Sequence, residues 1–196
     1  MIKVDVASKK FGETAVLRDI QFEVAAGETV AIVGRSGIGK STLLKLIAGT
    51  DTNFTGTINC SKSRSIVFQE PTLLPWRTTL QNITLVHEKL SISAARDALA
   101  RVGLAGKDDM FPGQLSLGQQ RRLSLARAFA GRPEVLIMDE PFVSLDSETA
   151  IEMLSLTETL IRDTRPATVF VTHSEDEAQR LGDRILKLSG SPATLF

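Results

Sequence analysis

The sequence predicts an α/β fold in which a parallel sheet forms the core and a helical lobe is inserted into it. Short apolar, β-branched runs typical of buried strands alternate with helical periodicity along most of the chain. One of these strands ends in a glycine-rich turn that leads directly into a helix. Between about residues 71 and 115 only helical periodicity is found, and this stretch is expected to form the inserted lobe.

The individual elements follow from their periodicity and from the residues that bound them. The predicted strands are short apolar or alternating runs, at Ile2–Val6, Ala15–Leu17, Ile20–Val24, Thr29–Val33, Ser65–Phe68, Glu134–Met138, Ala167–Thr172 and Asp183–Leu188. The predicted helices carry apolar residues on one face, at Lys40–Ala48, Leu80–Glu88, Ser93–Val102, Leu117–Ala130, Ser147–Asp163 and Glu175–Leu181. Gly49 is a plausible helix stop, and Met110–Gly113 reads as a turn.

Composition narrows the class of protein. The chain has 196 residues, of which 42% are hydrophobic, a globular balance that fits one domain with a small lobe. Lys+Arg and Asp+Glu are equal at 23 each, so no overall basic field draws the chain to nucleic acid or to an anionic membrane. Cys60 is the single cysteine and has no partner for an internal disulfide. No apolar run approaches the roughly 20 residues that cross a bilayer, so we expect a soluble protein of the cytosol.

A phosphate-binding loop is the first motif that carries chemistry. Gly34–Ser41 (GRSGIGKS) fits the pattern G-x-x-x-x-G-K-[ST], with a strand before it and a helix after it. Its backbone N–H groups and the positive helix end favour phosphate oxygens. Lys40 is placed to reach the β- and γ-phosphates, and the Ser41 hydroxyl to ligate Mg²⁺. The loop alone leaves kinases, GTPases and ATPases open.

Polar side chains at the ends of other predicted strands complete a catalytic hypothesis. Asp139 and Glu140 end an apolar strand at the sheet edge where ligands gather in such folds. We expect Asp139 to hold Mg²⁺ through water and Glu140 to act as the general base for an attacking water. His173 ends another strand and can contact a γ-phosphate or simply be satisfied locally. Gln69 follows a third strand and can contact Mg²⁺ or the water.

A second anion site is predicted at the start of a long helix. Ser116 and Gln119 have the spacing of a capping box, which is a purely structural explanation. Gly118 is harder to explain in that way, because glycine inside a helix costs about 1 kcal/mol against alanine. Close approach of a ligand to the backbone would account for it. Since the phosphate loop already surrounds one nucleotide, this second receptor more naturally serves a nucleotide on another chain.

Together these motifs resemble the ATP-binding subunit of an ATP-binding-cassette (ABC) transporter over essentially the whole chain. The signature segment Leu115–Gln119 (LSLGQ) is the most specific element, because it separates this family from other phosphate-loop enzymes. The resemblance implies a P-loop NTPase (RecA-like) core with an N-terminal antiparallel β subdomain, at about 1–70 and 116–196. The inserted α-helical subdomain is expected at about 71–115. Residues 1–196 then form one cassette without a C-terminal regulatory domain.

The resemblance also implies site residues and partners. ATP lies in a head-to-tail dimer between the phosphate loop of one ATP-binding subunit and the signature of the other. Phe11 is expected to stack on adenine, the alternative being core packing, and Asp146 to reach across the dimer, the alternative being a cap of the helix at Ser147. The implied catalytic residues are Glu140, His173 and Gln69, and the implied Mg²⁺ ligands are Ser41, Gln69 and Asp139. The implied nucleotide contacts are Phe11, Gly34, Arg35, Ser36, Gly37, Ile38, Gly39, Lys40, Ser41, Thr42, Ser116, Gly118, Gln119 and Asp146.

The expected function is ATP hydrolysis that powers an importer. The segment Val67–Leu85 resembles the branch that serves nitrate, sulfonates and taurine, most distinctively at Leu74-Pro75-Trp76. Trp76 either meets the membrane subunit or packs inside the helical lobe. Implied partners are transmembrane permease subunits and, indirectly, a solute-binding protein, with no nucleic acid, at the cytoplasmic face of the inner membrane. The alternatives are an exporter or mechanotransmission subunit and a soluble non-transport ABC ATPase.

One departure from the family pattern bears on activity. Leu117 stands where the signature segment usually has its first glycine. If that position needs a positive φ, leucine costs roughly 1–2 kcal/mol there. Because Ser116, Gly118 and Gln119 remain, a working site is still expected.

Overall fold

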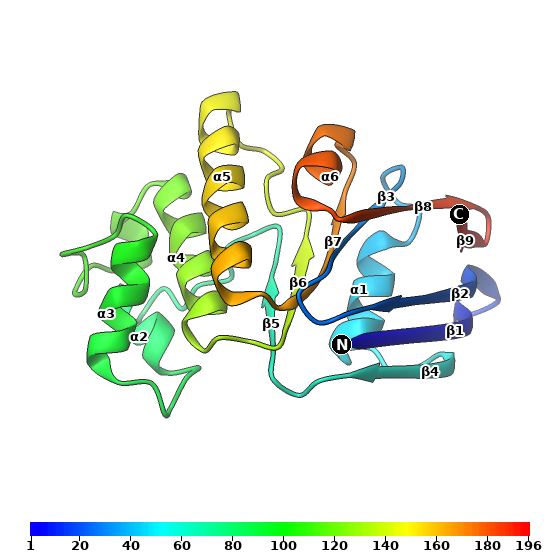
Figure 1. Cartoon of the computed structure of the whole chain (residues 1–196), viewed down its shortest axis with the longest axis horizontal. Helices are drawn as coiled ribbons and strands as arrows, with labels where there is room; N and C mark the ends of the chain where they lie inside the picture. Colours follow the sequence, from blue (N-terminus) through cyan, green and yellow to red (C-terminus); the bar gives the residue numbers. More distant parts are fainter. The chain divides into compact units, whose positions relative to one another are not determined.

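A computed structural model describes all 196 residues, Met1–Phe196 (Figure 1). The strands are β1 (Ile2–Phe11), β2 (Thr14–Val24), β3 (Thr29–Val33), β4 (Thr55–Cys60), β5 (Arg64–Val67), β6 (Val135–Asp139), β7 (Ala167–Thr172), β8 (Arg184–Gly190) and β9 (Ala193–Leu195). The α-helices are α1 (Lys40–Ala48), α2 (Thr79–Thr84), α3 (Ile92–Arg101), α4 (Leu117–Ala130), α5 (Ser147–Thr164) and α6 (Glu175–Leu181). A short 3₁₀ helix lies at Pro112–Gln114.

The chain forms two compact units. The sheet unit comprises Met1–Ile66, Glu134–Glu140 and Arg165–Phe196, and the helical unit comprises Val67–Pro133 and Pro141–Thr164. The helical lobe that the sequence predicts at about 71–115 is therefore part of a larger unit that also takes in α4 and α5. In the sequence, α4 and α5 lie next to predicted core strands, yet in the structure α4 packs against both α3 and α5. The hydrophobic periodicity of a sequence does not show which helices pack together.

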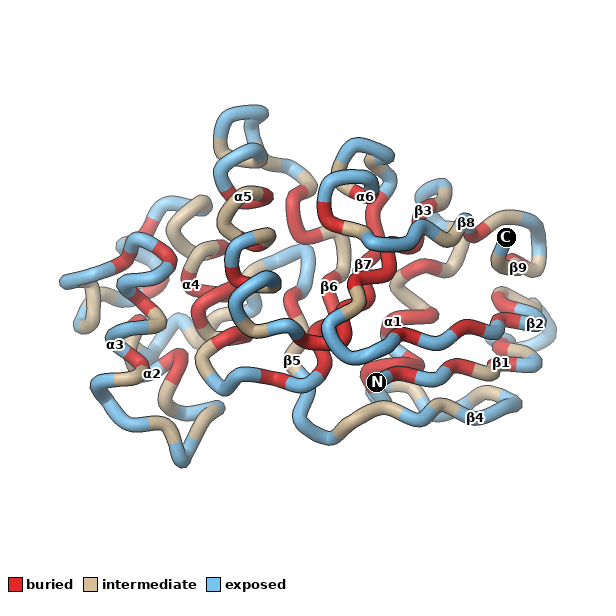
Figure 2. Tube along the Cα trace, viewed as in Figure 1, coloured by how far each residue is buried: buried red, intermediate tan, exposed pale blue.

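The sheet combines a parallel core with an antiparallel wing. Its strand order is β4-β1-β2-β9-β8-β3-β7-β6-β5, and the pairs β8–β3, β3–β7 and β7–β6 are parallel. Every residue of β3 and β7 is buried, as expected for parallel strands covered on both faces (Figure 2). In the wing, β1 pairs antiparallel with both β2 and β4.

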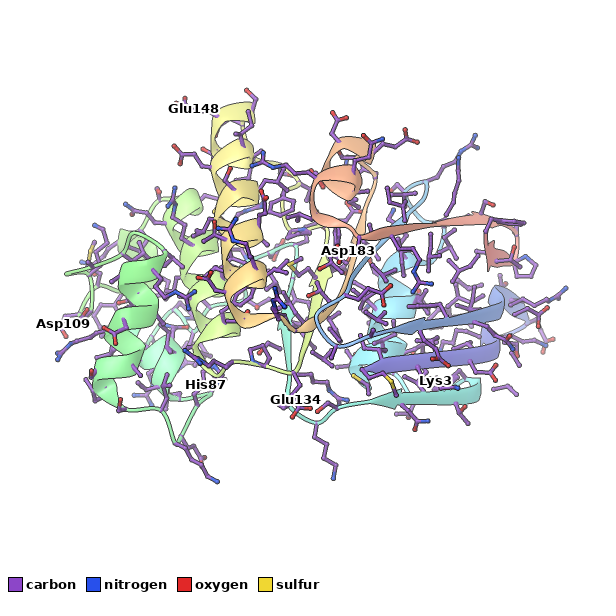
Figure 3. The ribbon with its side chains drawn as sticks, viewed as in Figure 1. Lys3, His87, Asp109, Glu134, Glu148 and Asp183 are labelled. Atoms are coloured by element: carbon purple, nitrogen blue, oxygen red, sulfur yellow. The ribbon has the colours of Figure 1, made fainter.

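Helices and a side-chain bond hold the parallel strands in place. Helix α1 packs against β6 and β7, and α6 packs against β3 and β7. The Asp183 carboxylate, labelled in Figure 3, accepts a hydrogen bond of 2.8 Å from the Thr29 backbone N–H. This contact ties the start of β3 to the residue just before β8. Because β3, β6 and β7 run parallel, their carboxyl ends lie at the same edge of the sheet.

Several predicted elements are confirmed residue for residue, and others differ. Strands β3 and β7 and helices α1, α4 and α6 have the predicted bounds. The predicted strands Ala15–Leu17 and Ile20–Val24 form one strand, β2. Arg18, which lies between them, pairs with Ser8 of β1, so the pairing of the two strands continues across the gap. Asp19 takes a φ of 49°, so the break is a local irregularity within a continuous strand. The predicted helix Leu80–Glu88 ends at Thr84, and 3₁₀-type backbone bonds from Val86 and His87 replace it.

Two strands were not predicted. Edge strand β4 is mostly exposed and lacks an apolar alternation, so its pairing with β1 provides its order. Strand β9 is only three residues long and joins β2 to β8. Both strands form because their backbones pair with distant strands, and local β-propensity does not predict such pairing.

The helical unit is held by buried apolar faces and by ion pairs on its surface. Helix α3 packs on α2 and α4, and α4 packs on α5. Arg101 pairs with Asp163 at 2.7 Å, and Arg122 pairs with Glu152 at 2.6 Å. Because these pairs are exposed, most of the stability comes from the apolar contacts. None of the helices combines the length and the apolarity that crossing a bilayer requires.

The edge strand gives a stability prediction. Gly56 lies opposite Val6 with a φ of 132°, and a Cβ there would overlap the Asp5 carbonyl oxygen and lie 2.9 Å from the Val6 Cα. We expect Gly56→Ala to lower the free energy of unfolding by about 2–4 kcal/mol, because strain and overpacking add. Urea denaturation measures this loss. Gly12→Ala is the control, since Gly12 has a φ of 58° and open space around its Cβ position. Equal losses in the two variants would contradict the close approach of β4 to β1.

Candidate nucleotide-binding site

The phosphate loop joins β3 to α1 in a conformation that depends on its glycines. Gly37 and Gly39 have φ values of 76° and 114°. A Cβ at Gly34 would lie only 2.8 Å from the Leu188 carbonyl oxygen. Gly39 is the N-cap of α1, and no side chain caps the first N–H groups of this helix. These free N–H groups and the positive helix end make the loop suited to bind an anion.

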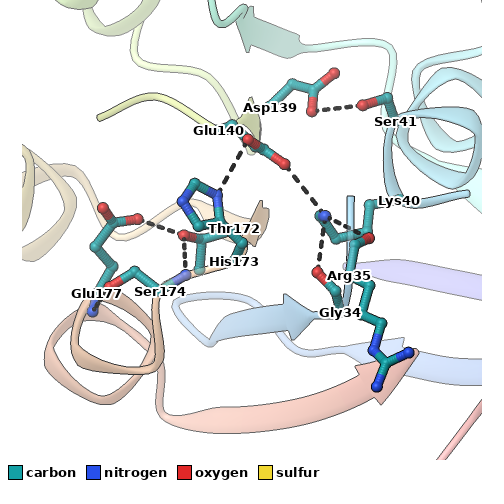
Figure 4. A network of polar contacts seen from close by, with 10 residues as sticks. All are labelled: Gly34, Arg35, Lys40, Ser41, Asp139, Glu140, Thr172, His173, Ser174 and Glu177. Carbon is teal, nitrogen blue, oxygen red and sulfur yellow. Dashed lines mark hydrogen bonds and ion pairs between the residues drawn. The ribbon is translucent and has the colours of Figure 1, made fainter. Parts of the chain in front are cut away.

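Lys40 is the buried cation of this loop. Its side chain is only 4% exposed, and its ammonium donates to the carbonyl oxygens of Gly34 at 2.9 Å and Arg35 at 3.1 Å. It also pairs with the Glu140 carboxylate at 3.2 Å (Figure 4). A buried ammonium must be compensated, and these three oxygens supply that compensation. A phosphate group would exchange for some of the same contacts.

Ser41 and Asp139 meet at the start of α1 and the end of β6. The Ser41 hydroxyl donates a hydrogen bond of 2.9 Å to the Asp139 carboxylate. Burial raises the pKa of the Asp139 carboxyl, and the nearby Glu140 adds to this rise, while Ser41, Lys45 and Lys40 oppose it. A hydroxyl and a carboxylate are hard oxygen donors of the kind that Mg²⁺ selects, so these two residues fit a magnesium site.

Glu140 and His173 form the other half of this network. Glu140 has a φ of 44°, and its backbone N–H donates to the Val171 carbonyl oxygen at 3.1 Å. Its carboxylate lies between Lys40 and the His173 ring, whose Nδ1 is 3.3 Å from Oε2 (Figure 4). A left-handed backbone at a non-glycine residue costs about 1–2 kcal/mol and is typical of functional sites. The sheet edge therefore holds the Glu140 carboxylate in one place.

A short chain of bonds places His173 beside Glu140. The Thr172 hydroxyl bonds to the Glu177 carboxylate of α6 and accepts the Ser174 N–H at 3.0 Å. The Ser174 hydroxyl in turn caps α6 by accepting the Glu177 N–H. The His173 ring is 57% exposed and has Glu140 as a local partner, so the contact with a γ-phosphate stays a prediction.

Phe11 is the last residue of β1, and its side chain is exposed to solvent. The residue is 56% exposed, so the core-packing alternative is wrong. The ammonium of Lys9 lies 4.6 Å from the ring centroid. Sequence reasoning misses Lys9. Its position two residues before Phe11 is the signal that could have indicated a cation beside the ring.

The signature segment caps α4 as its spacing predicted. The Ser116 hydroxyl accepts the Gln119 N–H at 3.2 Å, and the Gln119 amide oxygen accepts the Ser116 N–H at 3.1 Å. A Cβ at Gly118 would make ordinary contacts with the Thr149 methyl at 3.4 Å and the Ser116 Oγ at 4.0 Å, and the glycine has no positive φ. Nothing within the chain therefore requires glycine at this position.

The remaining predicted residues differ in the contacts that they make. Asp146 caps α5 by accepting the Thr149 N–H at 2.9 Å, so the capping alternative is realised, and this bond is the main cause of the lowered pKa of its carboxyl. Gln69 lies exposed just after β5 in the helical unit, and its predicted role stays a prediction. No side-chain hydrogen bond distinguishes Ser36, Ile38 or Thr42 within the loop.

A cavity in the helical unit does not coincide with these motifs. It has about 780 Å³ and is lined by α3, the end of α4 and the segment Leu85–Leu90. None of the predicted site residues lines it. The nucleotide chemistry is instead concentrated in the sheet unit, at the phosphate loop and the ends of β6 and β7.

The geometry defines a P-loop protein that binds a nucleoside triphosphate, and comparisons with known proteins give its family. The ABC transporter family model matches residues 17–143. The chain is 44% identical over 189 residues to the aliphatic sulfonates import ATP-binding protein SsuB of Frankia casuarinae, covering 96% of this chain and 63% of that protein. It is 46% identical over 184 residues to SsuB 2 of Rhizobium johnstonii, covering 92% of this chain and 74% of that protein. The chain therefore belongs to the ABC transporter ATP-binding family.

A solved structure supports the same assignment. The dimeric ATP-binding cassette MJ0796, bound to ADP and phosphate after hydrolysis, matches with a TM-score of 0.82 and 28% identity, over 100% of this chain and 96% of that one. The predicted family, its sulfonate-type branch and the P-loop fold class are thereby confirmed.

The signature segment gives a second stability prediction. Leu117 begins α4, lies 50% exposed and is not among the residues with positive φ. Leucine is therefore unstrained there, and we expect Leu117→Gly to lower the free energy of unfolding by about 0.5–1 kcal/mol. Leu117→Ala is the control, and it should change the free energy of unfolding by no more than a few tenths of a kcal/mol. A more stable glycine variant in thermal unfolding would show that the position does require glycine.

Proposed function

We propose that this chain is the ATP-hydrolysing subunit of an importer for aliphatic sulfonates or similar small anions such as taurine or nitrate. The observation that carries the proposal is the Lys40–Glu140–His173 network at the carboxyl ends of the parallel strands. Its geometry fits water activation beside a γ-phosphate. The sulfonate assignment rests on the names of the relatives and on the segment Val67–Leu85.

Nucleotide binding uses groups that are already in place. The N–H groups of the phosphate loop and of the first turn of α1 receive phosphate oxygens, and Lys40 moves its donors from the loop carbonyls to the phosphates. Ser41 and Asp139 would hold Mg²⁺, which would neutralise phosphate charge when bound. Phe11 stacks on the adenine with its exposed ring face. Gln69 is assigned the role of a further ligand of Mg²⁺ or of the attacking water.

Glu140 serves as the general base. Its carboxylate accepts a proton from water as that water attacks the γ-phosphorus. The bond from this phosphorus to the bridging oxygen of the β-phosphate breaks, so ADP and inorganic phosphate are the products. His173 orients the carboxylate and the phosphate during this step. The left-handed backbone of Glu140 keeps its side chain at the strand end during this step. Loss of one carboxylate oxygen should therefore affect the chemical step more than nucleotide binding.

A second copy of the chain completes the site. Ser116, Gly118 and Gln119 form an uncrowded helix start, and the phosphate loop needs no second receptor from its own chain. We infer a head-to-tail dimer in which these residues face the γ-phosphate on the partner subunit, with Asp146 at the same interface. The solved structures of MJ0796 are dimeric, which supports a dimer of this chain.

Transmembrane permease subunits are the proposed mechanical partners. Trp76 is 67% exposed, so it is available to a partner and does not pack inside the helical lobe. The buried Asn82 amide fixes the turn that presents it, by bonding to the carbonyl oxygens of Leu74, Arg77 and Thr78 at 3.0–3.1 Å. The chain then acts as a peripheral subunit at the cytoplasmic face of the membrane, and a solute-binding protein delivers the substrate.

Glu140→Gln tests the catalytic part of the proposal. The amide keeps the size of the side chain but loses its basicity, so we expect the hydrolysis rate to fall about 100-fold or more. ATP affinity should stay within about threefold, because Lys40 and the loop N–H groups remain. Phosphate release and ATP titration measure the two quantities. Glu134→Gln, an exposed change at the opposite end of β6, is the matched control.

The same variants test the transport part. In the source cell, replacement of the chain by Glu140→Gln should abolish uptake of a radiolabelled alkanesulfonate, while Glu134→Gln retains it. Normal hydrolysis by Glu140→Gln would remove Glu140 from the base role. Normal alkanesulfonate uptake despite lost hydrolysis would assign the chain to another transport system.

A further inference from the structure

Lys9 is a second buried cation, far in sequence from the phosphate loop. The residue is 1% exposed, although lysine is almost never fully buried without a partner. Its ammonium lies 2.7–2.8 Å from the two carboxylate oxygens of Asp51 and donates to the Asn53 carbonyl oxygen at 2.7 Å. These oxygens hold the ammonium in one position.

The acceptors of Lys9 belong to the segment that follows α1. The Asp51 N–H donates to the Lys45 carbonyl oxygen in the last turn of α1 at 3.2 Å. The Asp51 carboxylate also accepts the Asn53 N–H at 3.0 Å, and with Lys9 this lowers the pKa of the carboxyl. The ion pair thus connects β1 to the far end of the helix whose first turn binds phosphate.

The Phe11 ring is the remaining contact of this ammonium. Lys9 and Phe11 are two residues apart on β1, and the pairing of β1 with β2 is irregular between Lys9 and Lys10. The Nζ atom lies 4.6 Å from the ring centroid, within the range of a cation–π contact. Phe11 remains 56% exposed, so part of the ring is covered by the ammonium while part is free.

The exposed Phe11 ring needs the contact with the Lys9 ammonium to hold it in one orientation. Phe11 is next to Gly12 at the tip of the β1–β2 hairpin, and no apolar core surrounds its side chain. An exposed ring loses rotamer freedom when it stacks on a ligand, and that loss weakens binding. A cation withdrawn from water attracts the ring more strongly than an exposed one, because solvent screens it less. The cation also draws electron density from the ring, which reduces repulsion by a second π system on the open side.

We infer that Lys9 is a positioning residue for base recognition, which fixes the Phe11 ring from beneath so that its open face is ready to stack on the adenine of ATP. This inference rests on the proposed stacking role of Phe11. Lys9 then acts on the base and not on the phosphates, and only through Phe11. Its effect should vanish for a ligand without a base and in a chain without the Phe11 ring.

Lys9→Met tests the inference, because methionine keeps the apolar stem and removes the charge. We expect the Kd for ATP to rise about 3- to 10-fold, the size of a desolvated cation–π contact. The Kd for inorganic tripolyphosphate with Mg²⁺ should stay within about twofold. Lys10→Met is the matched control, since it makes the same change at the exposed next residue and should alter neither affinity.

Two further variants separate positioning from general stability. Lys9→Arg retains a cation over the ring and should restore ATP affinity to within about twofold of the natural chain. Lys9→Met combined with Asp51→Asn removes both charges, so no unpaired carboxylate is left to unfold the segment. Thermal unfolding of each variant identifies the folded ones, and calorimetric titration then gives both affinities.

A double-mutant cycle with Phe11→Ala gives the decisive comparison. In the Phe11→Ala background, Lys9→Met should cause no further loss of ATP affinity. An equal loss with and without the ring, or a parallel loss of tripolyphosphate affinity, would overturn the positioning role and leave the proposed function intact. If Phe11→Ala itself leaves ATP affinity unchanged, the stacking proposal for Phe11 fails first, and the inference about Lys9 fails with it.

Discussion

The pairing of Lys40 with Glu140 is the interaction on which the rest of the site depends. A buried ammonium is tolerated only with close oxygen partners, and Lys40 finds them in two carbonyls of its own loop and in the carboxylate at the end of β6. The same carboxylate meets His173 at the end of β7. One charge therefore fixes the carboxyl ends of three neighbouring strands relative to the phosphate loop, and this explains why the catalytic side chains share one edge of the sheet.

Two buried lysines bracket α1 in the same way. Lys40 anchors the first turn of the helix, and Lys9 anchors the segment that follows its last turn. Each ammonium is satisfied by oxygens of the sheet unit, and each touches a group proposed to meet ATP, Glu140 in one case and Phe11 in the other.

The sequence predicted the parts of this structure that local rules govern. Strands β3 and β7 and the phosphate loop follow from continuous apolar runs and from glycine spacing, so their bounds could be predicted. Strand β4 and the extent of the helical unit could not, because backbone pairing and helix packing join distant segments. Lys9 belongs to the second class, since its burial depends on Asp51 and Asn53 across the fold. The Lys40–Glu140 contact joins residues a hundred positions apart, and the sequence pattern did not predict it.

The central claim is that each chain carries two unlike half-sites, the phosphate loop and the signature segment, which complete each other only in a dimer. Mixing two inactive variants, Lys40→Ala and Ser116→Arg, and measuring ATP hydrolysis tests this claim most directly. Each variant alone should be nearly inactive, and the mixture should recover about a quarter of the natural rate, because half of random pairs are mixed and each mixed pair has one intact site. Full activity of either variant alone, or a mixture no faster than its components, would contradict the shared site.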